Sequence, residues 1–533
     1  MSGRMNRPMR VVGSLLLTSG FSMAACSASE NGGGRDGPGP DDYSGDSGAG
    51  DLGLDDGDGL SGVDGGMGGS APLPEEREDE SSFKAPVATG RYLWSANPQS
   101  GRVALIDGKT LGVQVLSAGL FPTHLSSVPR SDDEPSAIVL NVGSSDASWF
   151  RLAAGGATEK RLATHVGANR WSVGTSGQWA VAFSAAEAGQ ALDPTEGLQE
   201  ISVLRLRTKD PFVARLTVGY RPSRVLVANG DERVVVVSED GLTLLTLGAE
   251  PSVSAWVELG AASGRDVSLT NDGEYALVRR ADDERVEVIT LDNVETRTFL
   301  TFEGSVTDLD LSDSGRAVAV IREKHQIASF SFPDVLTSPL FDTAEFPDEI
   351  FGSAALTADG TRAVLYTNAV QNERVTIVNL TPGADYLDGR SLSTKSPVWS
   401  VTTSPDGGHA IVLGGTETAA AASFAVLSLT EARFPRVVGT GAGVRHVAMA
   451  DEAALITATN ATVHEAYVVR LPSLSVSKVP LSAAPLSAGA LYELGLGFVA
   501  QAHPEGRVTF FDLQSAEART LTGFELSAEV VDR

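Results

Sequence analysis

The chain has 533 residues, of which 42% are hydrophobic and 20% charged, and its 68 acidic side chains outnumber its 41 basic ones to give a net charge of −27. This apolar content is enough for a sizeable core, which excludes wholesale disorder. The acidity argues against nucleic-acid binding without sequence preference and against docking on anionic lipid through a basic face. A single cysteine excludes an internal disulfide, and no Cys/His group has zinc-finger spacing.

The first 25 residues predict a signal peptide. A basic start with three arginines precedes residues 11–25, an apolar or small-residue stretch that is too short to span a hydrocarbon core of about 30 Å comfortably. The stretch ends in Met23-Ala24-Ala25, and the only cysteine of the chain, Cys26, follows directly. This ending resembles a bacterial lipobox, with Met23 in place of the usual leucine.

The resemblance implies that Cys26 carries a diacylglyceryl thioether and becomes the first residue after cleavage. Ser27 in the next position resembles lipoproteins that are sorted to the outer membrane of Gram-negative bacteria. Three acyl chains would anchor the protein stably, because a single chain is only marginal. The alternative is ordinary signal-peptidase cleavage after Ala25, in which Cys26 has no role.

Residues 26–82 predict a disordered, acidic tether rich in Gly and Asp. Residues 30–82 contain 15 acidic and two basic side chains, a net charge of −13, so nearly half of the total charge lies in a tenth of the chain. Such a segment cannot bury enough apolar surface to offset the entropy lost on ordering. It would hold the folded part away from the bilayer.

From about residue 83 the sequence repeats one pattern. An alternating apolar strand leads into a turn with Asp-Gly or Ser-Gly, and then a β-branched run and a second alternating strand follow. In the four clearest copies the turn glycines are 42, 45 and 47 residues apart, at Gly273, Gly315, Gly360 and Gly407. A tight hairpin turn requires a positive φ, which glycine adopts without a Cβ clash. Helical periodicity is nearly absent, so the pattern predicts an all-β domain over 83–533.

Weaker copies on both sides extend the array to about ten units of four short strands, each about 44 residues long. Units of this kind are typical of β-propeller blades. In this interpretation the first unit, 91–107, lacks its innermost strand, and the segment that starts at Gly523 supplies a spare one. A last strand that completes the first blade would close the ring and remove free sheet edges.

The Ser-Pro-Asp-Gly turn at Ser404–Gly407, followed by a β-branched run, resembles the WD40-like and YVTN-type β-propellers of bacterial envelopes. The resemblance covers about 90–533, although the Trp-Asp dipeptide, the Asp-box and a repeated quinone-cofactor motif are all missing. Ten units exceed the usual four to eight blades. One large ring, two rings or fewer repeats than counted therefore remain open, and a stack of β-sandwich domains is the alternative fold.

Polar side chains lie at the predicted starts of the innermost strands, which in propellers converge on the central channel. The seven positions are His124, Arg170, Arg224, Asp266, Asp308, Trp399 and His446. Arg265 and Arg445 are adjacent to them, and Glu349 and Glu525 are nearby. Together these residues predict a funnel of mixed charge for a polar or anionic ligand. The alternative is that they satisfy backbone groups and solvent at a channel mouth.

The sequence contains no strong catalytic motif, and its seven histidines are scattered rather than paired at ligand spacing. No catalytic residue, metal or cofactor is therefore predicted. Five tryptophans alternate with small or apolar neighbours, which favours packing inside the blades. They are Trp94, Trp149, Trp171, Trp179 and Trp399.

Two functions remain open. The first is a lipid-anchored propeller of the cell envelope, at the outer membrane and facing the periplasm or the surface, that binds another envelope protein or a surface glycan without catalysis. The second is a hydrolase or lyase of the lactonase-like propeller kind, acting on a small polar ligand in the funnel. Those enzymes resemble one another in the acidic, Asn and His ligands around a central metal, whereas several arginines here would repel a divalent cation. Nucleic acid is not expected as a partner.

Overall fold

The computed structural model describes residues 85–128, 135–153, 156–185, 198–206, 211–228, 233–416 and 419–524. All of them belong to one compact unit, Asp79–Arg533. They form forty short strands, one helix of four residues, α1 (Asp334–Thr337), and two single-turn helices, η1 (Arg322–Lys324) and η2 (Tyr492–Leu494). Within these ranges no helix is both long and apolar enough to cross a membrane.

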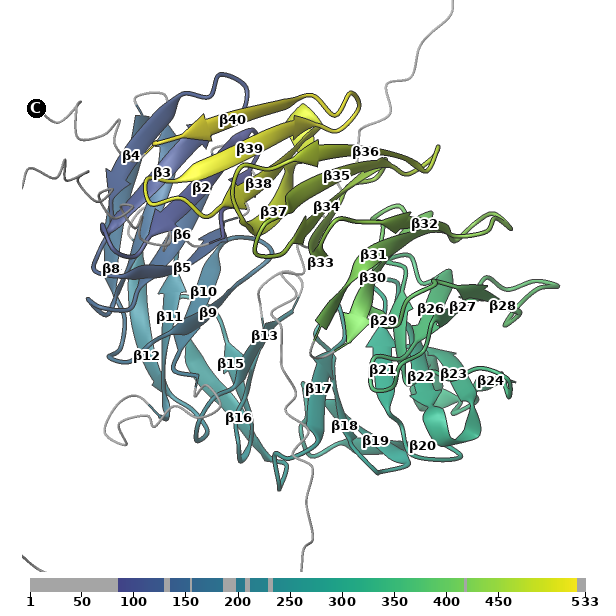
Figure 1. Cartoon of the computed structure of the whole chain (residues 1–533). Coiled ribbons are helices and arrows are strands. Elements are labelled where there is room, and N and C mark those ends of the chain that lie inside the picture. The colour runs from purple at the N-terminus through teal and green to yellow at the C-terminus, as the bar shows by residue number, and fades with distance from the viewer. Residues whose placement is uncertain are drawn as a thin grey trace, which may run out of the picture. The chain divides into compact units, whose positions relative to one another are not determined.

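The strands form ten antiparallel sheets of four, each made of strands consecutive in the chain. The sheets are the blades of one ring, and blade 10, yellow in Figure 1, lies beside blade 1, purple. The all-β propeller fold and the count of ten four-stranded blades are therefore confirmed. Of the two arrangements left open, one ring or two, the structure has one.

The strands are numbered in chain order, with the innermost strand of each blade first. Blades 1 to 3 consist of β1 (Val87–Thr89), β2 (Tyr92–Asn97), β3 (Arg102–Asp107), β4 (Val113–Ser117), β5 (Pro122–Ser127), β6 (Ser136–Asn141), β7 (Asp146–Ala153), β8 (Gly156–Ala163), β9 (Arg170–Val173), β10 (Trp179–Phe183), β11 (Glu200–Arg205) and β12 (Phe212–Thr217). Blades 4 to 6 consist of β13 (Arg224–Val227), β14 (Arg233–Val237), β15 (Gly241–Thr246), β16 (Ser252–Glu258), β17 (Arg265–Leu269), β18 (Tyr275–Arg280), β19 (Arg285–Thr290), β20 (Arg297–Thr301), β21 (Asp308–Leu311), β22 (Arg316–Ile321), β23 (Gln326–Ser331) and β24 (Asp342–Glu345).

Blades 7 and 8 consist of β25 (Ser353–Leu356), β26 (Arg362–Tyr366), β27 (Arg374–Asn379), β28 (Gly389–Ser393), β29 (Val398–Thr403), β30 (His409–Thr416), β31 (Ala419–Ser428) and β32 (Arg436–Gly439). Blades 9 and 10 consist of β33 (Gly443–Met449), β34 (Ala453–Thr459), β35 (His464–Arg470), β36 (Ser475–Pro480), β37 (Pro485–Leu491), β38 (Leu496–Gln501), β39 (Arg507–Asp512) and β40 (Ala518–Thr522).

The hydrophobic core is divided among the seams between neighbouring blades. Each seam contains one cluster of buried apolar side chains from the two sheets that face each other. The second strand of a blade lies between two such clusters, which explains the continuous apolar runs of the sequence. In β6, for example, Ile138 and Leu140 pack toward blade 3, while Ala137 and Val139 pack toward blade 1.

The predicted glycine turns connect the first and second strands of blades 5 to 8. All four glycines have positive φ, between 68° and 83°. In each turn the glycine N–H donates to the carbonyl three residues earlier, as Gly273 does to Thr270 at 2.8 Å and Gly407 to Ser404 at 2.9 Å. This part of the prediction is confirmed, because the repeat is set by a backbone conformation that only glycine adopts easily.

One expectation about the first blade is wrong. Val87–Thr89 forms its innermost strand and pairs with 92–94 of β2, so blade 1 has four strands of its own. The predicted closing strand begins at Gly523, but only Gly523 and Phe524 of it lie among the described residues. Within those residues, blade 10 meets blade 1 through side-chain packing that includes Phe510, Phe524 and Leu93.

The seam between the last and first blades provides a test of ring closure. Phe510, 1% exposed, fills this seam as Phe424, also 1% exposed, fills the seam between blades 8 and 9. We expect Phe510→Ala and Phe424→Ala each to lower the free energy of unfolding by about 3–5 kcal/mol, because each leaves a cavity in a packed core. Phe299→Ala, at a side chain 51% exposed, is the control. A denaturant titration in which Phe510→Ala behaves like Phe299→Ala would contradict closure.

Candidate functional site

The seven polar positions all lie in innermost strands. They occupy β5 (His124), β9 (Arg170), β13 (Arg224), β17 (Asp266), β21 (Asp308), β29 (Trp399) and β33 (His446). The structure joins several of them to the next blade, but it does not gather them into one cluster. Glu525 and Cys26 lie outside the described residues.

His124 and Arg170 meet across the seam between blades 2 and 3. The Arg170 Nη1 donates to His124 Nε2 at 2.7 Å. A guanidinium can only donate, so this imidazole nitrogen accepts and the contact selects the neutral ring. On the same seam the Trp171 indole N–H donates to Ser126 Oγ at 3.1 Å.

Arg224 and Asp266 form an ion pair between blades 4 and 5, with 3.1 Å between Nη1 and Oδ1. Their side chains are 51% and 40% exposed, so the pair contributes only about 0–1 kcal/mol. The neighbouring Arg265 also reaches blade 4, where its guanidinium donates to the Ser238 carbonyl, and it donates to the Gly260 carbonyl of the loop between the two blades.

Two aspartates join blades 6 and 7. Asp308 Oδ2 accepts from the Ala354 N–H at 2.9 Å, and Asp310 Oδ2 accepts from the Leu356 N–H at 2.7 Å. Both N–H groups belong to β25, an innermost strand whose second edge has no strand beside it. The carboxylates therefore supply acceptors that the sheet does not provide.

The environment of these aspartates shifts their titration. Burial raises the pKa of Asp308 to about 6, an effect strengthened by the nearby Asp310 and opposed by the Ala354 hydrogen bond and by Arg279. Burial also raises the pKa of Tyr366 to about 12, with the two aspartates adding to the effect. The sequence analysis missed Asp310, Tyr366 and Arg279 because it compared only the first positions of innermost strands.

Trp399 and His446 also face neighbouring groups. The Trp399 carbonyl accepts from Asn368 Nδ2 at 3.2 Å. His446 bonds to the backbone of Pro485 in blade 10, while burial and then Arg445 lower the pKa of its imidazole. His446 and His124 belong to blades 9 and 2, so blades 10 and 1 stand between them.

The ends of the crossing loops form a second feature. Crossing loops are the segments that link the outermost strand of one blade to the innermost strand of the next. Because each blade has four strands, these loops all lie on the same face of the ring, which we call the crossing face. Three consecutive loops present exposed apolar side chains, which we call the apolar arc: Leu120 (62% exposed), Phe121 (56%), Val166 (56%) and Tyr220 (41%).

The backbone of these loops is firmly held. The Tyr220 N–H donates to the Asp240 carboxylate at 3.0 Å, and its carbonyl accepts from the Glu239 N–H at 2.9 Å. The Leu120 N–H donates in the same way to Ser144 Oγ at 3.0 Å. The apolar side chains are therefore exposed on an ordered support.

Two of the loops that form the apolar arc share a sequence pattern. Gly119–His124 and Gly219–Arg224 share the pattern Gly-x-x-Pro-x-His/Arg, in which the third residue has a φ of +51° and the proline is buried. The sequence analysis used the last position of this pattern and overlooked the exposed residues before it.

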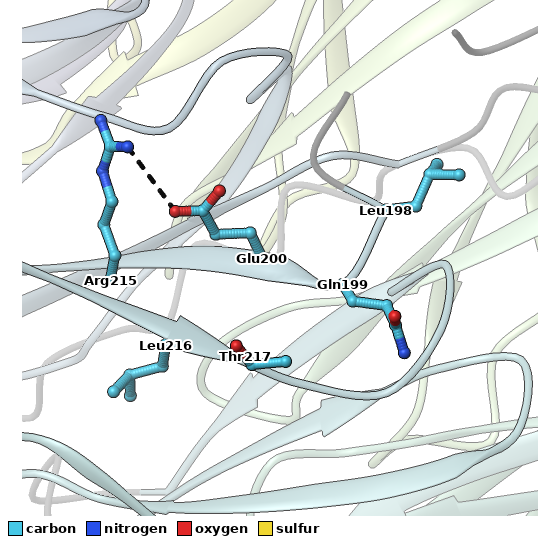
Figure 2. A pocket seen from close by; sticks show the side chains of 6 residues that line it. All are labelled: Leu198, Gln199, Glu200, Arg215, Leu216 and Thr217. Carbon is cyan, nitrogen blue, oxygen red and sulfur yellow. Dashed lines mark ion pairs between the residues drawn. The ribbon is translucent and has the colours of Figure 1, made fainter. Parts of the chain in front are cut away.

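A groove of about 280 Å³ lies at the outer part of blade 3. Figure 2 shows the six residues that line it, with the Arg215 guanidinium turned toward the Glu200 carboxylate. Their closest atoms are 3.7 Å apart. Across the described ranges no three His, Cys, Asp or Glu side chains are placed to hold a metal ion.

The Asp308 carboxyl predicts a pH effect on stability. Its raised pKa means that the folded protein binds a proton there more readily than the unfolded chain. This contribution to stability is present below about pH 4 and is lost as the pH rises through about 6. We expect Asp308→Asn to exceed the wild type in stability above pH 6, by at most about 3 kcal/mol, and to match it below pH 4.

The measurement is the difference between variant and wild type in unfolding free energy across this pH range. Using the difference matters because burial lowers the pKa of His165 to about 4, an effect of opposite sign that is common to both proteins. Asp283→Asn is the control, since hydrogen bonding to Arg285 lowers the pKa of that carboxyl. A constant difference between Asp308→Asn and wild type across the range would contradict the analysis.

No protein-family model matches this chain, and no curated protein matches it. Solved structures resemble the chain at low sequence identity. Dihydro-heme d1 dehydrogenase NirN in complex with DHE has 11% identity and a TM-score of 0.42 over 78% of this chain and 76% of that one. A eukaryotic initiation factor has 10% identity and a TM-score of 0.49, covering 71% and 93%, and apo AztD from Citrobacter koseri has 11% and 0.40, covering 64% and 94%.

Proposed function

We propose that the protein is a lipid-anchored β-propeller of the cell envelope that binds another envelope protein without catalysis. The anchor and the location rest on residues 1–82, where the sequence predicts a signal peptide, a lipidated Cys26, sorting to the outer membrane and an acidic tether. A tether of this length and composition has a root-mean-square extension of about 40 Å, enough for the ring to reach partners near the membrane.

The apolar arc is the observation that carries this proposal. Exposed aromatic and aliphatic side chains on a rigid backbone lose little conformational freedom on binding, so they suit a protein interface. The arc spans three crossing loops and four blades, which is wider than a small molecule would need. Between the protein and glycan partners that the sequence left open, this apolar character favours a protein.

The funnel residues support a scaffold rather than a reaction site. His124, Arg170 and Asp308 are engaged across seams, where they help to hold blades in place. The lactonase-like alternative needs metal ligands converging on the channel. Metal analysis of the purified protein tests it directly, and one stoichiometric divalent ion per chain would favour that alternative.

If the apolar arc is the binding surface, a variant that removes part of it should lose one protein partner. In cells, cross-linking followed by mass spectrometry should recover one recurrent protein with the wild type. The double variant Leu120→Ser/Phe121→Ser should lose most of it, because it removes two apolar side chains of the arc that are each more than half exposed. Phe434→Ser is the matched control, since Phe434 is 91% exposed in the loop before β32, on the opposite face. A partner that is lost equally in both variants, or in neither, would refute a binding role for the arc.

The proposed lipid anchor is tested separately, by replacing Cys26. Cys26→Ser should move the protein from the membrane to the soluble fraction and abolish labelling by an alkyne-tagged fatty acid, because the thioether forms only on a cysteine sulfur. A wild-type protein that carries no label, or a Cys26→Ser protein that stays on the membrane, would show that lipidation does not anchor this chain.

A further inference from the structure

Three side chains of the apolar arc occupy equivalent positions in neighbouring blades. Each lies four residues before a funnel residue of the blade that follows, so that Leu120, Val166 and Tyr220 correspond to His124, Arg170 and Arg224. In all three loops the next residue has a positive φ, 51° at Phe121, 84° at Gly167 and 51° at Arg221. The loops therefore share one backbone turn, and their apolar side chains repeat once per blade.

Hydrogen bonds confirm that two of these loops are held in the same way. The His165 N–H, just before Val166, donates to Ser202 Oγ at 2.8 Å. The Gly219 N–H, just before Tyr220, donates to Thr243 Oγ1 at 3.0 Å. Both hydroxyls belong to the third residue of the third strand of their blade. The repeat of the arc is therefore a property of the ordered backbone.

The spacing of the repeat follows from the packing of the blades. Sheets that pack face to face lie about 10 Å apart, so neighbouring positions of the arc are about 10 Å apart and the outer two about 20 Å. Direct contacts of β9 with β5 on one side and β13 on the other join the three blades near the axis. A ring of ten blades curves gently, so a straight segment can follow three neighbouring positions.

A straight partner segment that contacts every position must present apolar side chains at this spacing. In an α-helix, residues i and i+7 lie two turns apart on the same face, with a rise of about 10.5 Å. In an extended strand, side chains on one face repeat about every 6.6 Å, so a strand that matches one position of the arc misses the next. The spacing therefore favours a helix over a strand.

Charged groups beside the arc indicate what the rest of such a helix should carry. Three arginines near these loops are each paired with a glutamate, namely Arg161, Arg215 and Arg221. Asp146 and Asp240 accept instead from the neutral N–H groups of Asn141 and Tyr220, which leave their negative charge in place. The net charge of −27 acts in the same direction, so a basic partner would be attracted.

We propose that the protein partner binds the apolar arc through an amphipathic α-helix. Apolar residues at i, i+7 and i+14 would contact Leu120, Val166 and Tyr220, and lysines or arginines would flank this stripe. Phe121, 56% exposed, adds a contact at the blade 2 end, whereas the equivalent residue at the blade 4 end is Arg221, so one direction of the helix is favoured. This inference rests on the proposed function, since it specifies the partner of the same site.

The test maps the partner residue that each position of the arc touches. In cells that make the full-length protein, a benzophenone side chain replaces Leu120, Val166 or Tyr220, one at a time, and mass spectrometry locates the light-induced adduct. We expect the three labels in one segment of one protein, in chain order, with the outer two about 14 residues apart. An extended segment would place them about six residues apart. A benzophenone at Phe434, on the opposite face, should not label this segment.

A synthetic peptide of the labelled segment, titrated against the full-length protein by calorimetry, tests the helix itself. Tyr220→Ser should weaken binding about tenfold, whereas Val370→Ser, at a side chain 52% exposed in blade 7, should change it less than about twofold. Proline at a central, unlabelled residue of the peptide should weaken binding at least about tenfold, because it breaks a helix, while alanine there should not.

The outcomes separate this inference from the proposed function. Labels in separate segments of the partner, labels about six residues apart, or tolerance of the central proline would overturn the helix and leave the binding role of the arc intact. Absence of any labelled protein at all three positions would overturn both. An unchanged thermal midpoint of the benzophenone proteins and of Tyr220→Ser shows that none of these results reflects unfolding.

Discussion

The innermost strand of each blade has one hydrogen-bonding edge with no strand beside it, and the ring depends on how that edge is satisfied. A ring of ten blades brings these edges to the channel together. Side chains of the neighbouring blade supply some of the hydrogen-bond partners that these edges lack. Asp308 and Asp310 accept from N–H groups of β25, and Ser172 Oγ donates to the Val225 carbonyl at 2.8 Å. The same contacts join blade to blade near the axis, beside apolar seam residues of the innermost strands such as Leu309, Ala354 and Leu356. Polar residues at the start of the innermost strands are therefore part of what makes a ring of this size continuous.

The number of strands in a blade also decides which loops lie on which face of the ring. Crossing loops occur on one face because four strands return the chain to the side from which it started. The apolar arc and the turns that hold it belong to this face, whereas Leu340 and Phe434 are exposed on the other. The groove lined by residues 198–200 and 215–217 lies on the two outer strands of blade 3.

The architecture was largely predictable because it repeats in every blade. Gly273, Gly315, Gly360 and Gly407 mark equivalent turns, and the runs after them become second strands buried on both faces. The three residues of β1 escaped notice because Val87–Thr89 is too short to show alternation. The choice between one ring and two depended on whether Phe510 and Leu93 pack together, which no repeat encodes. The role of Asp308 was equally hidden, because its partner, the Ala354 N–H, is a backbone group that every sequence contains.

The seam between blades 10 and 1 differs from the other nine in its mechanics. Every other pair of neighbours is linked by a crossing loop as well as by side chains, but this seam joins the first and last of the described strands, so only non-covalent contacts bridge it. A pulling force on the chain before Val87 would act first on β1, which has three paired residues and contacts the innermost strands of both neighbouring blades, β5 and β37. The described ring can therefore open to an arc at this seam without breaking the chain, while a loop still links the two blades at each of the other nine seams.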